Sequence, residues 1–355
     1  MTLAINAVYH GFKVLQAQFV DEISSQAYIL EHIKSGARLL YLANDDDNKV
    51  FSISFRTPPA DDSGVAHILE HSSLCGSRKY PLKEPFVDLV KGSLNTFLNA
   101  MTFPDKTMYP VASRNDKDFH NLMDVYLDAV FYPSFYQNKY TLRQEGWHYN
   151  LDSLDGELSY NGVVYNEMKG VYSSPDAYLE NEAMKALFPD NCYRFESGGY
   201  PDAIPQLTQK KFEQFHKTYY SPENSYIYLY GDMDIDATLE YLDREYLSSF
   251  EKTGTVDSSI AEQQSLPRTA DIEAFYPVGA GGLHCQNISR AFYCNRQGNR
   301  PADQHGSEPA EKHIAGQRIL CTAPCTDGCR CGPDYQRQLY LQHVSAGIFY
   351  PCQRQ

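Results

Sequence analysis

The chain has 355 residues, which is enough for two domains of average size or one large domain. Its 45 acidic residues outnumber its 31 basic residues and give a net charge of −14, so we expect no nucleic-acid partner. No run of about 18 apolar residues occurs, so we expect no membrane span. The first ten residues lack both a secretory pattern and an arginine-rich targeting pattern, so we expect a cytoplasmic location in a bacterial cell.

The first 56 residues predict a series of strands, because apolar and polar side chains alternate along them. These strands are expected at residues 12–20, 25–32, 37–43 and 50–56. An acidic turn at residues 45–48 lacks the glycine and the terminal glutamate of a calcium-binding loop, so we interpret it as a solvated turn.

A helix is expected at residues 65–74, directly after the last of these strands. Asp62 or Ser63 is a suitable N-cap, since both residue types accept a hydrogen bond from the first helical turn. Gly76 is typical of the position that ends a helix.

This helix carries the most informative pattern of the chain, His67-Ile68-Leu69-Glu70-His71. Residues four apart lie on one helix face, so His67 and His71 can offer two imidazole nitrogens to one metal ion. Glu70 lies close to the same face and can reach a water molecule on that metal. The alternative is a chance match on an amphipathic helix, because short motifs carry a false-positive risk.

The next two hundred residues predict a mixture of helices and strands. A strand is expected at residues 94–100 with a hairpin partner at 107–111, and a buried strand at 225–231. Amphipathic spacing predicts helices at residues 84–91, 116–131, 142–149, 164–172, 177–187, 209–219 and 236–247. We therefore expect an α+β fold, with a largely antiparallel sheet covered by helices on one face and an irregular C-terminal tail.

Three separated blocks carry a resemblance to a known family. They are residues 64–71 with the following Cys75-Gly76-Ser77, residues 93–102, and residues 160–170 with their Asn-Glu-Met-Lys-Gly sequence. Together they resemble the pitrilysin-type (inverzincin) zinc metallopeptidases, and within them the presequence-protease subgroup. The resemblance covers residues 12–277 and corresponds to the N-terminal catalytic domain only.

The resemblance implies a zinc metalloendopeptidase unit. It implies that His67, His71 and Glu167 bind one Zn²⁺ per chain, and that Glu70 is the catalytic general base. Zinc suits a ligand set of two histidines and one glutamate, although the ligands alone do not exclude manganese or cobalt. Taken alone, Glu167 is better explained as a solvated helix carboxylate, because most glutamates lie at the surface.

The resemblance also implies the substrate and how it binds. Family members cleave unstructured peptides, and full-length relatives enclose them with a C-terminal half that lies outside the matched region. Asn99 and Ala100 are implied as substrate-binding residues that hold an extended peptide at a sheet edge. The alternative for Asn99 is a residue that merely satisfies a turn. Glu145 and His148 are further candidate ligands, but His148 beside the only tryptophan is better explained as a packed residue.

Two other functions compete with a working peptidase. The chain could be a truncated zinc- and peptide-binding fragment with little or no activity, because the opposing half is missing. It could also be a non-catalytic structural subunit, although such relatives usually lose motif residues and all four are present here.

The composition changes near residue 277, which predicts a domain at residues 1–277 and an irregular Cys-rich tail at 278–355. Seven of the nine cysteines and a local excess of basic residues lie in the tail. We favour a reading-frame change, which leaves the tail disordered. The alternatives are a disulfide-rich extension, or a second zinc module built on the following residues: Cys321, Cys325, Cys329 and Cys331, with His313 or His343.

Overall fold

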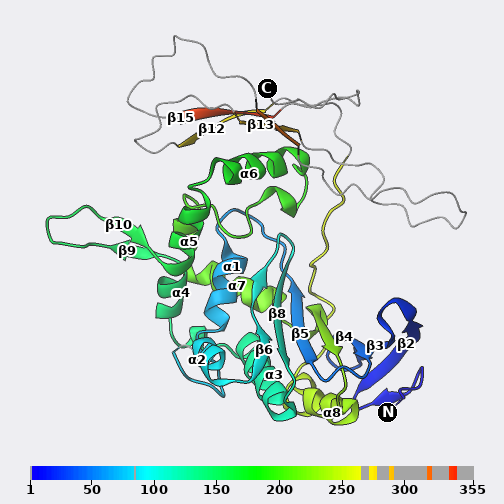
Figure 1. The fold of residues 1–355 in the computed structure, drawn as a ribbon. Coiled ribbons are helices and arrows are strands. Elements are labelled where there is room, and N and C mark those ends of the chain that lie inside the picture. The colour runs from blue at the N-terminus through cyan, green and yellow to red at the C-terminus, as the bar shows by residue number, and fades with distance from the viewer. Residues whose placement is uncertain are drawn as a thin grey trace, which may run out of the picture. The chain divides into compact units, whose positions relative to one another are not determined.

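The computed structural model describes residues 2–83, 85–264, 272–277, 288–291, 318–321 and 336–341 (Figure 1). The chain divides into two compact units, of which the first comprises Met1–Lys169 and Glu196–Ile260. The second comprises Gly170–Phe195 and Ala261–Gln355. The first unit contains the candidate site residues His67, Glu70, His71, Asn99, Ala100 and Glu167.

The first unit is built around a nine-stranded sheet with the order β1-β2-β3-β4-β11-β5-β8-β6, in which β7 also pairs with β8. Every pairing is antiparallel except that of β11 with β4. Its strands are β1 (Val8–Tyr9), β2 (Phe12–Val20), β3 (Ser25–His32), β4 (Arg38–Ala43), β5 (Lys49–Arg56), β6 (Asn95–Leu98), β7 (Met101–Thr102), β8 (Lys106–Ser113) and β11 (Ser225–Tyr230).

The core of this unit includes a row of buried side chains that crosses six neighbouring strands. Paired residues in neighbouring strands point to the same face of a sheet, so the strand register defines the row. All its members are at most 2% exposed: Val14, Leu30, Leu39, Ile227, Ile53 and Tyr109. The alternation that predicted the strands therefore also predicts which residues are buried.

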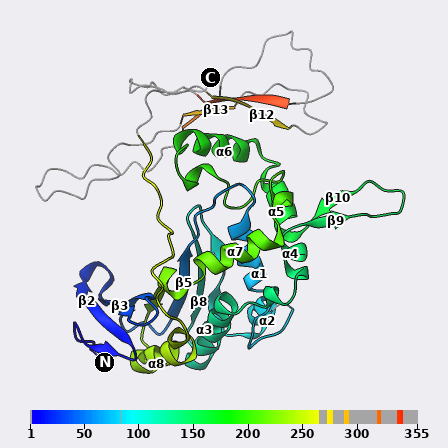
Figure 2. The same ribbon diagram turned by 180° about the vertical axis from the view of Figure 1, so that it is seen from behind.

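Helices pack against this buried face. In particular, α1 and α3 contact β8, and α3 also contacts β5 (Figures 1 and 2). The helices of this unit are α1 (Val65–Ser73), α2 (Pro85–Gly92), α3 (Asp116–Phe131), α4 (Tyr140–Glu145), α5 (Val163–Val171, of which all but the last two residues belong to this unit), α7 (Gln209–Tyr219) and α8 (Ile235–Glu245). Short 3₁₀ turns lie at Asp21–Ile23, Ser134–Tyr136, Ile204–Gln206, Pro222–Asn224 and Leu247–Ser249. The predicted fold class, a largely antiparallel sheet with helices, is confirmed.

The helix predicted at residues 142–149 is wrong in its second half. Helix α4 ends at Glu145, and the chain then forms a hairpin of β9 (His148–Asn150) and β10 (Ser159–Asn161). The rings of Trp147 and Tyr160 pack edge to face, with centroids 5.6 Å apart. Trp147 fitted the helical pattern, but it directly precedes β9 and packs on Tyr160 of β10, in the hairpin that Figure 1 shows.

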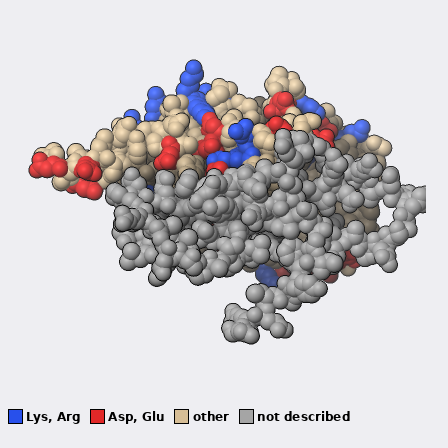
Figure 3. Space-filling view, turned by 90° about the horizontal axis from the view of Figure 1, so that it is seen from above, with Lys and Arg blue, Asp and Glu red and all other residues tan. Residues whose placement is uncertain are grey.

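The tip of this hairpin is acidic. Asp152, Asp155 and Glu157 lie in the loop that joins its two strands. Figure 3 shows acidic side chains in red at the end of an arm that projects to the left. Leu154 between them is 96% exposed. The arm lies outside the packed core of the unit and adds little to its burial.

The second unit contains α6 (Pro175–Leu187), a 3₁₀ turn at Cys192–Arg194 and a four-stranded sheet with the order β12-β15-β13-β14. The strands are β12 (Ile272–Pro277), β13 (Ile288–Ala291), β14 (Arg318–Cys321) and β15 (Gln336–Leu341). Most of the predicted tail lies outside the described residues, as do His313, His343 and three of the four cysteines of the candidate second zinc module. The boundary at residue 277 therefore stays a prediction. Within the described residues, no helix is long and apolar enough to cross a membrane.

Candidate active site

Helix α1 carries both motif histidines and begins differently from the prediction. The N-cap is Gly64, with φ +66° and no side-chain cap, so the expected capping by Asp62 or Ser63 is wrong. The Asp62 carboxylate accepts a hydrogen bond from the Glu196 amide at 2.8 Å instead. The side chain that was expected to start the helix thus binds a loop 134 residues further along the chain.

A glycine is required at position 64 by both its conformation and its surroundings. The left-handed region favours glycine, since any other L-residue places its Cβ too close to the backbone. A Cβ at Gly64 would also lie 2.6 Å from Gly199 Cα and 2.7 Å from the Gly198 carbonyl oxygen. The absence of a side chain therefore lets the loop at residues 196–200 approach the start of α1.

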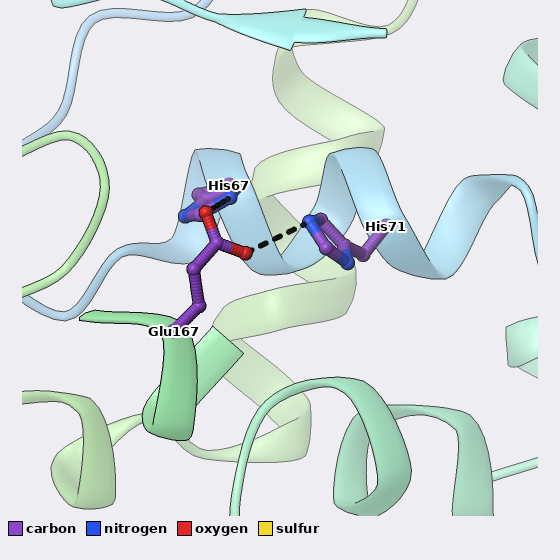
Figure 4. Close-up of side chains that lie close together, drawn as sticks. All are labelled: His67, His71 and Glu167. Atoms are coloured by element: carbon purple, nitrogen blue, oxygen red, sulfur yellow. Dashed lines mark ion pairs between the residues drawn. The ribbon is translucent and has the colours of Figure 1, made fainter. Parts of the chain in front are cut away.

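The structure brings the three predicted metal ligands together. Glu167 on α5 lies opposite the two histidines of α1, with its Oε1 3.7 Å from His67 Nε2 and its Oε2 3.8 Å from His71 Nε2 (Figure 4). One ligand atom from each residue lies within 4.8 Å of the other two. The Glu167 side chain is about half exposed, but its carboxylate points at both imidazoles rather than away from them.

Each histidine is held from behind by an acceptor on its other ring nitrogen. His67 Nδ1 lies 3.0 Å from the Gly198 carbonyl oxygen, and since a carbonyl only accepts, Nδ1 must donate. His71 Nδ1 lies 3.5 Å from Glu145 Oε2. Both contacts leave Nε2 as the nitrogen that faces Glu167. This arrangement is typical of metal-binding histidines, whose second nitrogen donates to a carbonyl or carboxylate.

Glu145 is a buried carboxylate next to His71. It was considered as a metal ligand, but it lies behind His71 rather than beside the other two ligands. Burial alone would raise the pKa of Glu145, but the interactions with His71, Cys75 and Gln144 together outweigh it and lower that pKa. The other candidate, His148, donates from Nδ1 to the Arg143 carbonyl oxygen and lies outside the cluster.

The charge around His71 favours its protonated form. Burial of the ring by itself lowers the pKa of His71, but the hydrogen bond with Glu145 and the negative charges of Glu70 and Glu167 raise it above the ordinary value. A site that stabilises a proton on His71 also stabilises a cation that replaces the proton. The donor set and its electrostatics thus fit a divalent metal ion such as zinc.

The position of Glu167 depends on a close contact between two glycines. Gly162 precedes α5 with φ +154°, and a Cβ there would lie 2.2 Å from the Gly146 carbonyl oxygen. That carbonyl accepts a hydrogen bond from the Tyr165 amide at 3.3 Å. The start of α5 is therefore fixed against the end of α4, which also carries Glu145.

Glu70 lies on α1 between the two histidines and is 7% exposed. Its Oε2 accepts a hydrogen bond of 2.7 Å from the hydroxyl of Thr102 on β7. Burial raises the pKa of Glu70, and the hydrogen bond from Thr102 with the nearby histidines offsets part of that rise. A carboxyl group with a raised pKa is suited to exchange protons near neutral pH.

Asn99 and Ala100 lie between β6 and β7, at the edge of the sheet. The Asn99 side-chain oxygen accepts a hydrogen bond from the backbone amide of Ala100 at 3.0 Å. The backbone amide of Asn99 donates to the Pro110 carbonyl. Tyr126 donates its hydroxyl to the Asn99 carbonyl at 3.2 Å. These contacts agree with the turn-satisfying alternative, and the substrate role of both residues stays a prediction.

Sequence reasoning missed two residues that complete the site. Gly198 lies 131 residues from the histidine it binds, and no local pattern marks it. Thr102 was part of the block that supported the resemblance, but nothing in its spacing relates it to Glu70. Both contacts arise from the tertiary structure alone.

Comparisons with known proteins identify the family of the chain. The family model described as Insulinase (Peptidase family M16) matches residues 56–169, and Peptidase M16 inactive domain matches residues 206–277. Protein HypA of Clostridium perfringens is 57% identical over 265 residues, which are 75% of this chain and 27% of that protein. Presequence protease 1, chloroplastic/mitochondrial, of Arabidopsis thaliana is 51% identical over 273 residues, which are 77% of this chain and 25% of that protein.

The fold is similar to that of pitrilysin. The crystal structure of pitrilysin matches with a TM-score of 0.55 at 17% identity, over 79% of this chain and 27% of that one. The chain thus spans about a quarter of the length of these relatives. It belongs to the pitrilysin-type M16 peptidase family and is similar to the presequence proteases.

Proposed function

We propose that this chain is a zinc metalloendopeptidase unit that hydrolyses unstructured peptides. The observation that carries the proposal is the convergence of His67, His71 and Glu167 from two helices that lie 96 residues apart at their nearest ligands. Chance motifs do not bring a third ligand to the same point, and the acceptors behind both histidines favour a metal role.

His67, His71 and Glu167 would hold one Zn²⁺ per chain. When bound, zinc supplies a Lewis acid that polarises a carbonyl group and acidifies water. The protein's contribution is to fix the two imidazoles, through Gly198 and Glu145, so that both Nε2 atoms lie opposite Glu167.

Glu70 would act as the general base. Its carboxylate would take a proton from the attacking water and then give that proton to the leaving amine. The raised pKa of Glu70 makes its carboxylate a stronger base for the first transfer, and the Thr102 hydroxyl on Oε2 orients the carboxylate and leaves Oε1 for the proton.

An extended peptide would bind along the edge of the sheet. Strand β6 ends the strand order, so its outer edge offers backbone groups to a further strand. Asn99 and Ala100 directly follow β6 and would position the peptide there. For the Ala100 amide to pair with substrate, the Asn99 side chain must release it and turn towards the peptide.

Two measurements test the proposal. Mass spectrometry under native conditions should find one zinc ion per chain, and His71→Ala should lose it. An unstructured fluorogenic peptide should be cleaved by the wild-type chain, and Glu70→Gln should abolish cleavage while retaining zinc. Glu22→Gln is a matched control, because this glutamate is exposed on the 3₁₀ turn at Asp21–Ile23. Equal cleavage by wild type and Glu70→Gln would exclude the proposed chemistry.

A second candidate function is zinc and peptide binding with little turnover. This function is the alternative predicted from the sequence and stays a proposal. Zinc binding and peptide binding without cleavage would support it. The cytoplasmic location predicted from the sequence is part of the proposal and would be tested by fractionating cells that contain the protein.

A further inference from the structure

The segment before α1 and the loop at residues 196–200 are joined by two hydrogen bonds through one residue. The Asp62 carboxylate accepts from the Glu196 amide, and the Asp62 carbonyl accepts from the Tyr200 amide, each at 2.8 Å. Asp62 therefore binds both ends of the loop, which we name the 196–200 loop.

The 196–200 loop is also closed from within. The Glu196 carboxylate accepts from the Gly198 amide at 3.0 Å, and the Glu196 carbonyl accepts from the Gly199 amide at 3.1 Å. With both amides engaged in this way, the peptide unit between Ser197 and Gly199 has one orientation. The consequence is that the Gly198 carbonyl points at His67 Nδ1, 3.0 Å away.

The 196–200 loop also contacts α5, the helix that carries Glu167. A Cβ at Gly198 would lie 2.8 Å from Met168 Cε, so the loop packs directly against the residue that follows Glu167. On the other side, Gly199 lies against Gly64, at the start of α1. The loop is thus packed between the two helices that carry the metal ligands.

We propose that Asp62 is a positioning residue of the metal site. It acts through the 196–200 loop to hold the Gly198 carbonyl on His67, which keeps the proton on Nδ1 and leaves Nε2 free for a metal ion. What Asp62 contributes is a hydrogen-bond acceptor, not a charge, because its partners are two neutral amides. This inference rests on the proposed zinc site, but the state of the His67 ring is measurable without zinc.

The first test is the tautomer of His67 in the metal-free protein, read from the ¹⁵N chemical shifts of its ring. The wild-type chain should show a protonated Nδ1 and an unprotonated Nε2. Asp62→Ala should shift the ring towards a mixture of the two tautomers, since the loop no longer fixes the carbonyl. Asp62→Asn should resemble the wild type, because the asparagine oxygen still accepts from the Glu196 amide.

The second test is zinc affinity, measured by competition with a chromophoric chelator. Loss of a partner behind a metal-binding histidine costs about 10–100-fold in metal affinity, so Asp62→Ala should weaken zinc binding by about tenfold or more. Asp62→Asn should restore most of the affinity. Glu196→Ala, which releases the Gly198 amide, should weaken binding in the same way and provides an independent route to the same result.

Asp61→Ala is the matched control. Asp61 is the adjacent acid, but its carboxylate accepts from the Ser63 amide and pairs with Lys211 rather than with the loop. Urea unfolding of each variant separates general destabilisation from the specific effect. Asp61→Ala should retain both the His67 tautomer and the zinc affinity, even where it lowers stability.

The proposal is overturned if Asp62→Ala keeps the wild-type tautomer and zinc affinity, or if Asp62→Asn loses as much affinity as Asp62→Ala. Failure of the proposed function has a different signature. In that case the wild-type chain binds no zinc, while the tautomer of His67 still responds to Asp62→Ala and not to Asp62→Asn.

Discussion

Gly64→Ala tests whether the close approach at the start of α1 is required. Two costs add in this variant. A residue with a Cβ in the left-handed region destabilises the folded state by about 1–2 kcal/mol. Overpacking at a tightly packed position destabilises it by about 1–3 kcal/mol more. The second cost applies here because the new Cβ would meet backbone atoms of Gly198 and Gly199 within 2.9 Å, and backbone cannot rotate away as a side chain can. We expect a total loss of about 2–5 kcal/mol in the free energy of unfolding.

Gly254→Ala is a control with the same backbone angle. Its φ is also +66°, but among the described residues a Cβ there meets no atom within 4 Å. It should lose only the conformational cost, about 1–2 kcal/mol. Urea unfolding followed by circular dichroism measures both variants. Equal losses would show that the approach of the 196–200 loop imposes no steric requirement at Gly64.

Three further predictions concern single residues. Thr102→Val removes the hydroxyl that donates to Glu70 and raises the pKa of Glu70 further, so the acidic limb of the pH profile of peptide cleavage should move to higher pH. Thr102→Ser should restore the wild-type profile. An unchanged profile in Thr102→Val would contradict the role of Thr102 in setting the pKa of Glu70. Glu145→Ala should weaken zinc binding by about 10–100-fold in a chelator competition, and an unaltered affinity would show that His71 needs no partner on Nδ1. Burial lowers the pKa of His216 from 6.5 to about 4, so the unfolded chain binds a proton that the folded chain excludes between these values. Stability should therefore be full above pH 6.5 and fall by up to about 3 kcal/mol as the pH drops to 4, whereas urea unfolding of His216→Gln should lack this component.

The helices were predicted best where burial follows a regular spacing. Residues 116–131 and 209–219 were predicted as helices and are α3 and α7 at the same bounds. Asn115 caps α3 by accepting from the Asp118 amide, and Thr208 caps α7 in the same way. In both helices the local signals and the tertiary packing agree, so the pattern alone is sufficient.

The hairpin at β9 and β10 was missed because local and tertiary signals disagree there. Residues 147–150 are aromatic and polar in a spacing that also fits a helix, whereas the strand pairing depends on Ser159–Asn161 further along the chain. A pattern within a short window contains no information about that partner.

The residues of the candidate site also divide into those that the sequence predicts and those that depend on the tertiary structure. The histidines and Glu70 were predicted from one helix, and Glu167 from a resemblance that places a glutamate in a second helix. The Gly198 carbonyl could not be predicted, since a backbone oxygen has no residue signature and its position depends on a loop far along the chain. Asp62 was predicted to be a cap, because the same oxygen that suits a helix start also suits a distant amide.

The place of β11 in the sheet has a consequence for how the first unit folds. This strand, Ser225–Tyr230, lies between β4 and β5, although about 170 residues separate it from β5 in sequence. A nascent chain that has not yet reached residue 225 therefore leaves unpaired backbone N–H and C=O groups at the edges of β4 and β5, and such edges readily pair with other chains. The insertion of this late strand completes the sheet on which α1, the helix with the two motif histidines, packs. Folding of the unit is expected to be slow, limited by long-range pairing, and dependent on protection of that gap during synthesis.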